Sequence, residues 1–339
     1  MNHELVRKVA DAVLYEGYML YPYRPSAIKN RQRWTFGILY PPAFPEVRLG
    51  TERNSMHSEC LAETTADASV RVELRFLHLL ARQVERANGM DSFETVSALG
   101  VDDELFESWD EALERSVVIE LANLNAPQQL SFRFPASGET EPLHDRGGRL
   151  AGRIARTQHE VRGTISVSFR HLDEKLVRLV IDVFNDTALD SRSASRNSAL
   201  LCSLLSAHSI LTASGAQFVS LLDPPEHLRE AVDACRNVGN FPVLAGDSPE
   251  RDMMLCSPIV LYDYPQVAPE SASSFFDATE MDEMLTLRVM TLTDEEKCEM
   301  RRADSRVREL LDRTEQSARQ QLARTHGVIR SMHSTNEES

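Results

Sequence analysis

The sequence predicts an α+β fold in which a central antiparallel β-sandwich or barrel-like domain follows a helical N-terminal segment and precedes a mixed α/β, helix-ending C-terminal region. The first observation is the alternation of apolar and charged residues at 70–76. The second is a series of four further strand-like runs between residues 116 and 184, with turn residues between them. The third is a helix-capping pattern at residues 293–296.

The chain divides into four predicted regions. Residues 1–65 form an N-terminal helix and a basic segment rich in aromatic residues and prolines, and residues 66–190 form the antiparallel β-domain. Residues 191–324 form a mixed C-terminal domain that ends in a long helix. Residues 325–339 are polar and are predicted to be a disordered tail.

The N-terminal region begins with a predicted helix over residues 4–19, because its apolar residues recur at helical spacing. Pro22 and Pro25 end regular structure after that helix. Residues 34–40 predict a short strand that is closed by the prolines after it. Residues 50–65 are polar and are predicted to form a loop.

The β-domain is predicted from alternation along each strand. Val70, Val72, Leu74 and Phe76 alternate with charged residues, as in a half-buried strand. The acidic residues 88–112 are predicted to form an exposed loop or short helix, and Gly147–Gly148 predicts a hairpin turn. The further predicted strands are Ser116–Leu121, Leu130–Phe134, Val161–Arg170 and Leu176–Phe184.

The C-terminal region is predicted to be mixed, with several helices and one buried apolar stretch, Asp252–Tyr262. Thr293 and Glu296 form a capping box, in which each side chain accepts a hydrogen bond from a backbone N–H near the start of the helix. The helix that this box opens is predicted to reach about residue 321. The other predicted helices are Ala199–Leu211, Glu226–Val238 and Thr279–Thr291.

The 339-residue chain is acidic, with a formal net charge of −15. Residues 1–50 contain seven Lys/Arg and four Asp/Glu, a balance of +3, so the remaining residues carry −18. A chain of this charge is not expected to bind nucleic acid, because binding to phosphates is driven by cations. A basic start on an acidic body favours docking to an acidic surface, a phosphate or another copy of the chain.

Several sequence features predict a cytoplasmic protein without a membrane segment. The five cysteines are widely spaced and include no C-x-x-C pair, which is typical of a reducing compartment. No apolar run approaches the roughly 20 residues that cross a bilayer. Residues 1–8 lack the apolar region of a signal peptide.

A basic aromatic segment at residues 21–34 is the first candidate functional site. Guanidinium groups pair with carboxylates and phosphates and stack on aromatic rings, so the segment is predicted to dock an anion or a partner. In the alternative interpretation, the cations are solvated and their aliphatic stems cover the tyrosines. The candidate partner-binding residues are Tyr21, Tyr23, Arg24, Lys29, Arg31, Arg33 and Trp34.

A second candidate segment covers residues 256–283, where prolines set the path of a loop beside an apolar run. Its candidate partner-binding residues are Tyr262, Asp263 and Tyr264. Three carboxylates spaced three residues apart would share one face of a helix and could bind a hard cation or a basic partner. Alternatively, they only stabilise a helix N-terminus. These carboxylates are Asp277, Glu280 and Glu283.

His57 and Cys60 form an H-x-x-C pair that could begin a metal site, although zinc needs three or four ligands. The sequence contains no G-x-S-x-G elbow, no phosphate-binding loop of the G-x-x-x-x-G-K-[ST] type and no dinucleotide fingerprint. No metal site is favoured and no cofactor is predicted. The catalytic residues, if the chain has any, are not identified by a motif.

Two stretches resemble bacterial proteins that are encoded beside NiFe hydrogenases and their maturation factors. One is residues 13–34, and the other runs from Ser257 to Lys297. The resemblance implies an accessory or assembly role for a hydrogenase, with a hydrogenase subunit or maturation protein as the partner. It implies no catalytic residue.

The resulting hypothesis is a non-catalytic accessory protein that acts by protein–protein binding. One alternative is a metal-dependent enzyme or metal carrier that uses the histidine, cysteine and carboxylate candidates. Another is a structural homo-oligomer, in which the basic segment of one copy packs on the acidic body of the next.

Overall fold

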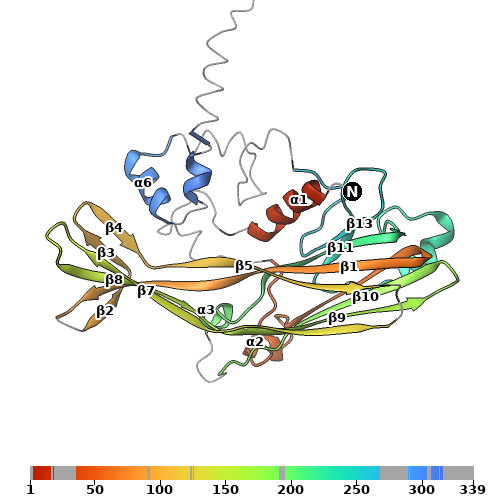
Figure 1. The fold of residues 1–339 in the computed structure, drawn as a ribbon, viewed down its shortest axis with the longest axis horizontal. Helices are drawn as coiled ribbons and strands as arrows, with labels where there is room; N and C mark the ends of the chain where they lie inside the picture. Colours follow the sequence, from red (N-terminus) through yellow and green to blue (C-terminus); the bar gives the residue numbers. More distant parts are fainter. Residues whose placement is uncertain are drawn as a thin grey trace, which may run out of the picture.

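The structure, a computed structural model, is dominated by one antiparallel sheet with helices on its outer surface (Figure 1). Within the described residues, eleven strands belong to this sheet, which confirms the predicted α+β class and the antiparallel sandwich-like arrangement. No helix in the described part of the chain is long and apolar enough to span a bilayer. The structure describes residues 3–16, 18, 36–89, 92–122, 124, 126–190, 195–267, 289, 291–303, 307–312, 314 and 315.

The sheet is built around β1 (Ser55–Ala87), a strand of 33 residues. Its first part pairs with β10 (Leu176–Asn185) and its middle with β11 (Leu205–Phe218) and β5 (Trp109–Leu121). Its last part pairs with β8 (Leu150–Gln158) and β2 (Phe93–Val96). One continuous strand therefore links every part of the sheet.

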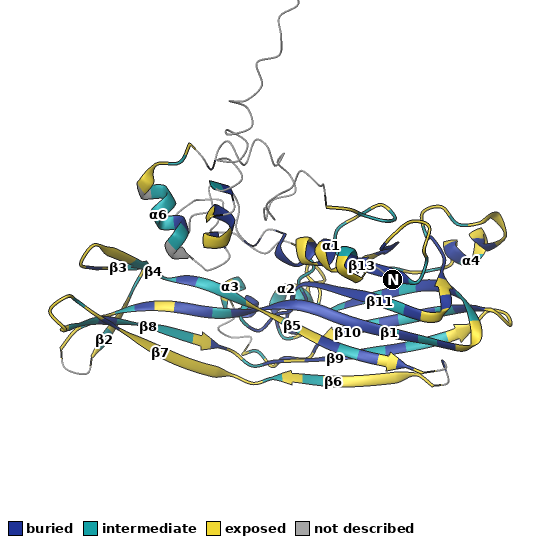
Figure 2. Cartoon of the chain, turned by 45° about the horizontal axis from the view of Figure 1, so that its top comes forward, coloured by how far each residue is buried: buried dark blue, intermediate teal, exposed yellow. Residues whose placement is uncertain are grey.

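Two layers of strands enclose the main core. Figure 1 shows β10 and β9 (Val161–His171) running beneath β1, β5 and β11. The strand order is β12-β13-β11-β1-β10-β9-β6, with β6 (Gln128–Phe134) at one edge. At the other edge lie β12 (Phe241–Leu244) and β13 (Met253–Ser257). Buried residues follow β1, β11 and β13, whereas β6 and β7 (Ser137–His144) are largely exposed (Figure 2).

The core consists of apolar side chains that alternate along the strands, as the sequence predicts. Leu74, Phe76, Ile165 and Leu179 are fully buried in one cluster that both layers share. Burying an apolar side chain of this size stabilises a fold by about 1.5–3 kcal/mol relative to leaving it in water. The charged residues between these positions point to the opposite face of β1, where they meet a helix.

An elongated arm extends from one end of the body, at the left of Figure 1. It contains β7 (Ser137–His144), β8, β2 and a separate hairpin of β3 (Ala98–Val101) and β4 (Glu104–Glu107). A small apolar cluster of its own holds the arm together. The predicted turn at Gly147–Gly148 joins β7 to β8, and Gly148 adopts φ +77°, a value that favours glycine.

Short helices cover the outer faces of the sheet. The predicted N-terminal helix is confirmed as α1 (His3–Tyr15), which packs on β11 and β13. The capping box is also confirmed, since Glu296 N–H donates to Thr293 Oγ1 at 3.2 Å at the start of α6 (Asp294–Ala303). The remaining helices are α2 (Pro45–Arg48), α3 (Arg196–Leu200), η2 (Glu226–Leu228) and α4 (Arg229–Asp233).

Three predicted elements are wrong. Residues 55–65 belong to β1 rather than a loop, because their polar side chains lie on the outer face of a paired strand. The acidic residues 93–112 form β2, β3, β4 and part of β5. The predicted helix at Ala199–Leu211 stops at Leu200, and the apolar residues after it enter β11, which is buried on both faces.

Other predicted boundaries also differ from the structure. Residues 36–40 contribute only an isolated bridge, from Leu39 to Leu204, in place of a strand. The sheet extends beyond the predicted 66–190 region, because its strands run from Ser55 to Ser257. Helix α6 ends at Ala303, and residues 307–312 are again helical. Most of the predicted helix at 279–291 and the whole 325–339 tail lie outside the described residues.

Candidate functional site

Most of the predicted site residues lie outside the described part of the chain. This applies to every candidate in the basic segment and to the three acidic candidates. The residues concerned are Tyr21, Tyr23, Arg24, Lys29, Arg31, Arg33, Trp34, Asp277, Glu280 and Glu283. Their proposed roles therefore remain predictions from the sequence.

The described residues that follow the basic segment lie against the start of the second candidate segment. Gly37 lies three residues after the end of the basic segment, and its carbonyl accepts a hydrogen bond from the Ala207 N–H at 2.9 Å. A Cβ atom at Gly37 would lie 2.8 Å from the side chain of Pro258, which is the third residue of the second segment. The sequence gives no sign of this contact, because 220 residues separate the two positions.

The second segment contains a loop, residues 258–264, that is anchored to the sheet edge by Asp263. Ser220 Oγ donates to one carboxylate oxygen of Asp263 at 2.5 Å, and the Leu244 N–H donates to the other at 2.8 Å. The Tyr264 N–H donates to the Leu244 carbonyl at 2.7 Å, and its side chain packs on the main core. Asp263 and Tyr264 thus hold the loop in place.

Two side chains of this anchored loop project into solvent. Tyr262 is 87% exposed and Val260 is 69% exposed. Between them, Leu261 packs against the cluster that α1 forms with β13. Of the three predicted binding residues here, Tyr262 alone is presented to solvent in this way.

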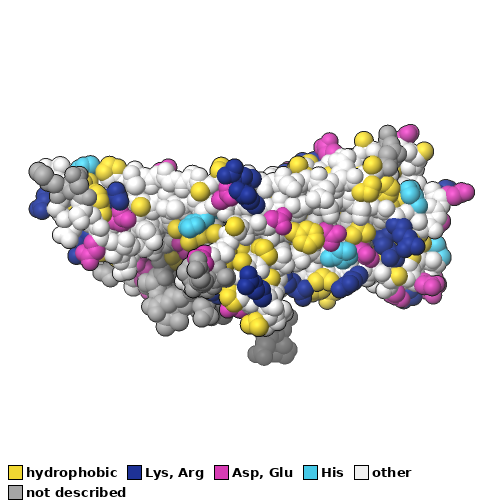
Figure 3. Space-filling model, turned by 90° about the horizontal axis from the view of Figure 1, so that it is seen from below, with side chains coloured by type: hydrophobic (Ala, Val, Ile, Leu, Met, Phe, Trp, Pro, Cys, Tyr) yellow, Lys and Arg dark blue, Asp and Glu magenta, His cyan; other side chains and the backbone are white. Residues whose placement is uncertain are grey.

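A cavity of about 310 Å³, which we call the arginine cavity, is lined by residues 37–40, which follow the basic segment, together with residues 51–53, Arg196 and Gly239. Two arginines from different parts of the chain line it, Arg53 just before β1 and Arg196 at the start of α3. The face that carries α2 and α3 in Figure 1 shows cations beside hydrophobic side chains (Figure 3). The other lining residues are Gly37, Ile38, Leu39, Tyr40, Thr51, Glu52 and Gly239.

Tyr40 forms a rigid wall of the arginine cavity. Its ring stacks on Phe44, with ring centroids 4.8 Å apart. Burial raises the pKa of the Tyr40 hydroxyl, while the neighbouring Arg196 guanidinium opposes that shift. The hydroxyl keeps its proton at neutral pH and can therefore donate a hydrogen bond.

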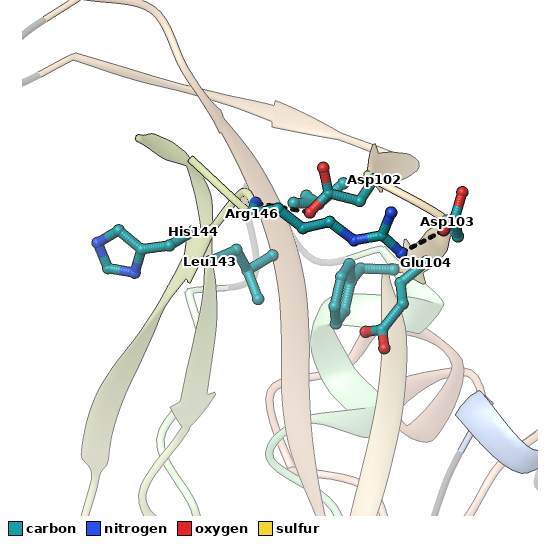
Figure 4. A pocket seen from close by; sticks show the side chains of 8 residues that line it. Asp102, Asp103, Glu104, Leu143, His144 and Arg146 are labelled. Atoms are coloured by element: carbon teal, nitrogen blue, oxygen red, sulfur yellow. Dashed lines mark hydrogen bonds and ion pairs between the residues drawn. The ribbon is translucent and has the colours of Figure 1, made fainter. Parts of the chain in front are cut away.

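A second cavity, of about 450 Å³, lies between the β3–β4 turn and the β7–β8 turn of the arm (Figure 4). We call it the hairpin-tip cavity. The Arg146 backbone N–H donates to Asp102 Oδ2 at 2.8 Å, and its guanidinium pairs with Asp103. Figure 4 shows His144 pointing away from these carboxylates. Arg146 therefore compensates part of the negative charge at this tip.

The structure does not bring His57 and Cys60 together. Residues three apart in a strand point to opposite faces, and Cys60 lies in the main core while His57 faces outward. The His57 ring instead lies between Asp182, at 2.7 Å from Nδ1, and Glu59, at 3.4 Å from Nε2. Burial raises the pKa of the Cys60 thiol. Among the described residues, no group of three or more His, Cys, Asp or Glu side chains is placed to hold a metal ion.

A charged layer between α1 and β1 was not found from the sequence. Arg7 of α1 pairs with the buried Glu73 at 3.1 Å, and Arg75 pairs with Asp11 of α1 at 2.6 Å. Beside them lies His208, whose burial lowers its pKa to about 4. The alternation of charges at residues 71, 73 and 75 indicated an exposed face, but α1 covers it.

No protein-family model matches this chain, and no curated protein is significantly similar to it. The class of protein is therefore defined by its fold, an α+β protein built on a large antiparallel sheet. Its distinctive surface features are one anchored loop with an exposed tyrosine and two cavities lined by charged residues.

Proposed function

We propose that this chain is a non-catalytic accessory or assembly protein that acts by protein–protein binding, with the 258–264 loop as its docking surface. The observation that carries the proposal is the exposure of Tyr262 on a loop whose neighbouring residues, Leu261 and Asp263, are fixed to the fold. Tyrosine is enriched at the centres of protein interfaces, because its ring buries a large area and its hydroxyl still forms hydrogen bonds.

The anchoring of the loop favours binding for a thermodynamic reason. A loop that is already ordered loses little conformational entropy when it contacts a partner, so more of the contact energy appears as affinity. The hydrogen bonds from Ser220 and Leu244 to Asp263 supply this order before any partner arrives. Val260 adds a second exposed apolar side chain two residues from Tyr262.

The proposed partner is a hydrogenase subunit or maturation protein, and its identity rests on the resemblance of residues 13–34 and 257–297 to proteins encoded beside NiFe hydrogenases. The contact between Gly37 and Pro258 supports a shared role for the two stretches, because Gly37 lies three residues after the first stretch and Pro258 lies at the start of the second. The basic segment would then add cations to the same docking region.

The first test is co-purification of the tagged full chain from its native host. We expect the wild-type chain to recover a hydrogenase component and Tyr262→Ala to reduce that recovery about tenfold, the change that a loss of about 1.4 kcal/mol produces. The matched control is Leu49→Ala, since Leu49 is 78% exposed and directly follows α2, outside the 258–264 loop. Equal recovery by all three proteins would refute the proposed surface.

The second test addresses the basic segment. The double substitution Arg24→Glu and Arg33→Glu is expected to weaken recovery of the partner while leaving the thermal midpoint nearly unchanged, because the proposal assigns these cations to the partner and not to the fold, and substitutions with no structural role usually shift stability by less than about 0.5 kcal/mol. A large loss of stability would show that the segment is structural instead. The accessory role would be rejected if the wild-type chain recovered no hydrogenase component and deletion of the gene left hydrogenase activity normal.

A further inference from the structure

β6 is an edge strand of the sheet with one open side. It pairs with β9 from Gln128 opposite Val167 to Phe134 opposite Val161, and no described strand pairs with its other side. In an antiparallel ladder the residues point their N–H and C=O groups alternately to the two sides, so about half of these groups in β6 face the open side. Figure 2 shows β6 and β7 following one another along the same exposed rim. An open row of backbone groups of this kind is a template for a further strand.

Two other edge strands carry features that hinder the addition of a strand. β12 contains Pro242, and its Leu244 backbone is bonded to Asp263 and Tyr264 of the 258–264 loop. β7 contains Pro142 between charged and exposed residues. Proline lacks an N–H for the ladder, and a covered backbone has no free groups to offer. These two edges are therefore closed to a partner strand.

β6 has neither kind of protection. Its sequence, residues 128–134, contains no proline and no acidic residue. Its single charged side chain, Arg133, pairs with Glu160, which also pairs with Arg162. The edge carries little net charge of its own, so the negative charge of the whole chain is not concentrated where a second strand would lie.

The core-facing side of β6 is incompletely covered. Phe132 and Phe134 pack against the main core, and Leu130 lies on the same side of the strand because side chains alternate. Leu130 is nevertheless 40% exposed. An added strand would remove apolar surface of Leu130 from water, and this burial favours association.

The strand is complementary to a second copy of itself. When two copies run antiparallel about a two-fold axis at Ser131, Leu130 of one copy lies opposite Phe132 of the other, and Gln129 lies opposite Arg133. An apolar residue thus meets an aromatic one, and an amide meets a cation. No like charges lie opposite each other, and such matched cross-strand pairs stabilise a sheet.

We propose that the chain forms a homodimer by antiparallel pairing of β6 with β6 of a second copy, centred on Ser131. The interface is closed by its two-fold axis, and it joins the β9–β10 layers of the two molecules into one continuous sheet. The inference is independent of the proposed function, because the 258–264 loop lies beside β12, at the other end of the strand order. A dimer of this kind carries two such loops.

Sedimentation equilibrium of the full chain tests for the dimer. We expect a monomer–dimer equilibrium with a dissociation constant on the order of 10–100 µM, because one pair of seven-residue strands buries less area than the roughly 1,200–2,000 Å² of a stable interface. A chain that stays monomeric at about 500 µM, roughly five times the weakest expected value, would overturn the proposal.

A charge exchange at the two-fold axis tests the register. Ser131 is exposed, and in the proposed dimer any residue at this position lies opposite its own copy. Ser131→Lys and Ser131→Glu are each expected to weaken dimerisation about fivefold, because like charges then meet. An equimolar mixture of the two variants is expected to dimerise at least as well as the wild type, since Lys then meets Glu. Unweakened single variants, or a mixture that does not recover, would overturn the pairing.

The matched control is Ser214→Lys, the same change at an exposed position of β11. It is expected to dimerise like the wild type, and all variants should keep the wild-type thermal midpoint. Weakening by Ser214→Lys equal to that by Ser131→Lys would overturn the assignment to β6.

Salt dependence separates this interface from docking of the basic segment on the acidic body. Raising the ionic strength from about 0.1 M to about 1 M shortens the screening length from about 10 Å to about 3 Å and should leave the wild-type dimer nearly unchanged, because β6 pairs through backbone and apolar groups. Dissociation of the dimer by salt would overturn the β6 interface in favour of the charged one.

Discussion

The two cavities contain similar residues but differ in what their arginines do. In the hairpin-tip cavity, Arg146 is paired with Asp103 through its guanidinium and with Asp102 through its backbone N–H. In the arginine cavity, Arg53 makes no such pair within the described chain. The first arrangement connects two turns of the arm, and the second leaves a cation without a partner in the described chain. A charged side chain that lines a cavity therefore supports the fold only where the fold pairs it.

The largest expected effect is a loss of folding stability at low pH. The cavity variants should therefore be compared at a pH at which the fold keeps its full stability. Burial lowers the pKa of both His78 and His208 from about 6.5 to about 4, so these rings are neutral in the folded state. The unfolded chain binds more protons between these two pH values, so stability is fully present above about pH 6.5 and falls as the pH drops toward 4.

Each histidine accounts for a loss of about 3 kcal/mol across this range, because one pKa unit corresponds to about 1.36 kcal/mol. Chemical denaturation at pH 7.5 and pH 4.5 measures the change in the free energy of unfolding. His208→Gln should flatten this pH dependence if His208 contributes as expected. If the free energy of unfolding of the wild type stayed constant between pH 7.5 and pH 4.5, the buried, neutral state of both rings would be contradicted.

The next effect concerns the wall of the arginine cavity. Gly37 adopts φ +54°, and a Cβ atom there would lie 2.8 Å from Pro258. Gly37→Ala is expected to destabilise the fold by about 1–3 kcal/mol, because it combines an unfavourable backbone conformation with a steric clash. Thermal unfolding measures this loss. Gly50 also adopts a positive φ, but no atom lies near the position of its Cβ. Gly50→Ala therefore measures the cost of the backbone conformation without a steric clash.

A smaller effect is expected at the hairpin-tip cavity. Arg146→Ala removes the ion pair with Asp103, and both side chains are highly exposed. Such exposed pairs contribute about 0–1 kcal/mol, so the thermal midpoint should fall slightly and the fall should shrink at high salt. A loss well above this range would show that the cation is essential to the arm.

The smallest effect is expected for Arg53→Ala. Since Arg53 is exposed and unpaired, its removal should change the free energy of unfolding by less than about 0.5 kcal/mol. Urea denaturation of this variant beside Arg146→Ala completes the comparison. If Arg53→Ala proved to be the more destabilising of the two, Arg53 would be a structural residue and the distinction between the cavities would fail.

Sequence patterns predicted the elements whose signals are local. The alternation at Val70–Phe76 and at Ile165–Phe169 predicted strands because period-two burial reflects the geometry of one strand alone. The Thr293–Glu296 capping box predicted the start of α6 for the same reason, since both partners lie within one helical turn. The Gly147–Gly148 turn was equally local.

The predictions failed where a distant segment decided the outcome. Residues 55–65 read as a polar loop, but β10 pairs with them and residues 226–238 cover part of their outer face. The His57–Cys60 pair suggested a metal site only because its position on a strand was unknown. Of the three candidates on the 258–264 loop, the structure leaves Tyr262 exposed and uses Asp263 and Tyr264 as anchors, a division that the sequence could not show.

By itself, the sequence determined the α+β class, the antiparallel character of the central domain and the acidic charge, because these follow from composition and short-range periodicity. Only the tertiary structure decided that β1 links the whole sheet, that Gly37 meets Pro258 and that Arg53 and Arg196 line one cavity. Such contacts join residues more than a hundred positions apart. They depend on the register and packing of complete strands, and no short pattern along the chain encodes them.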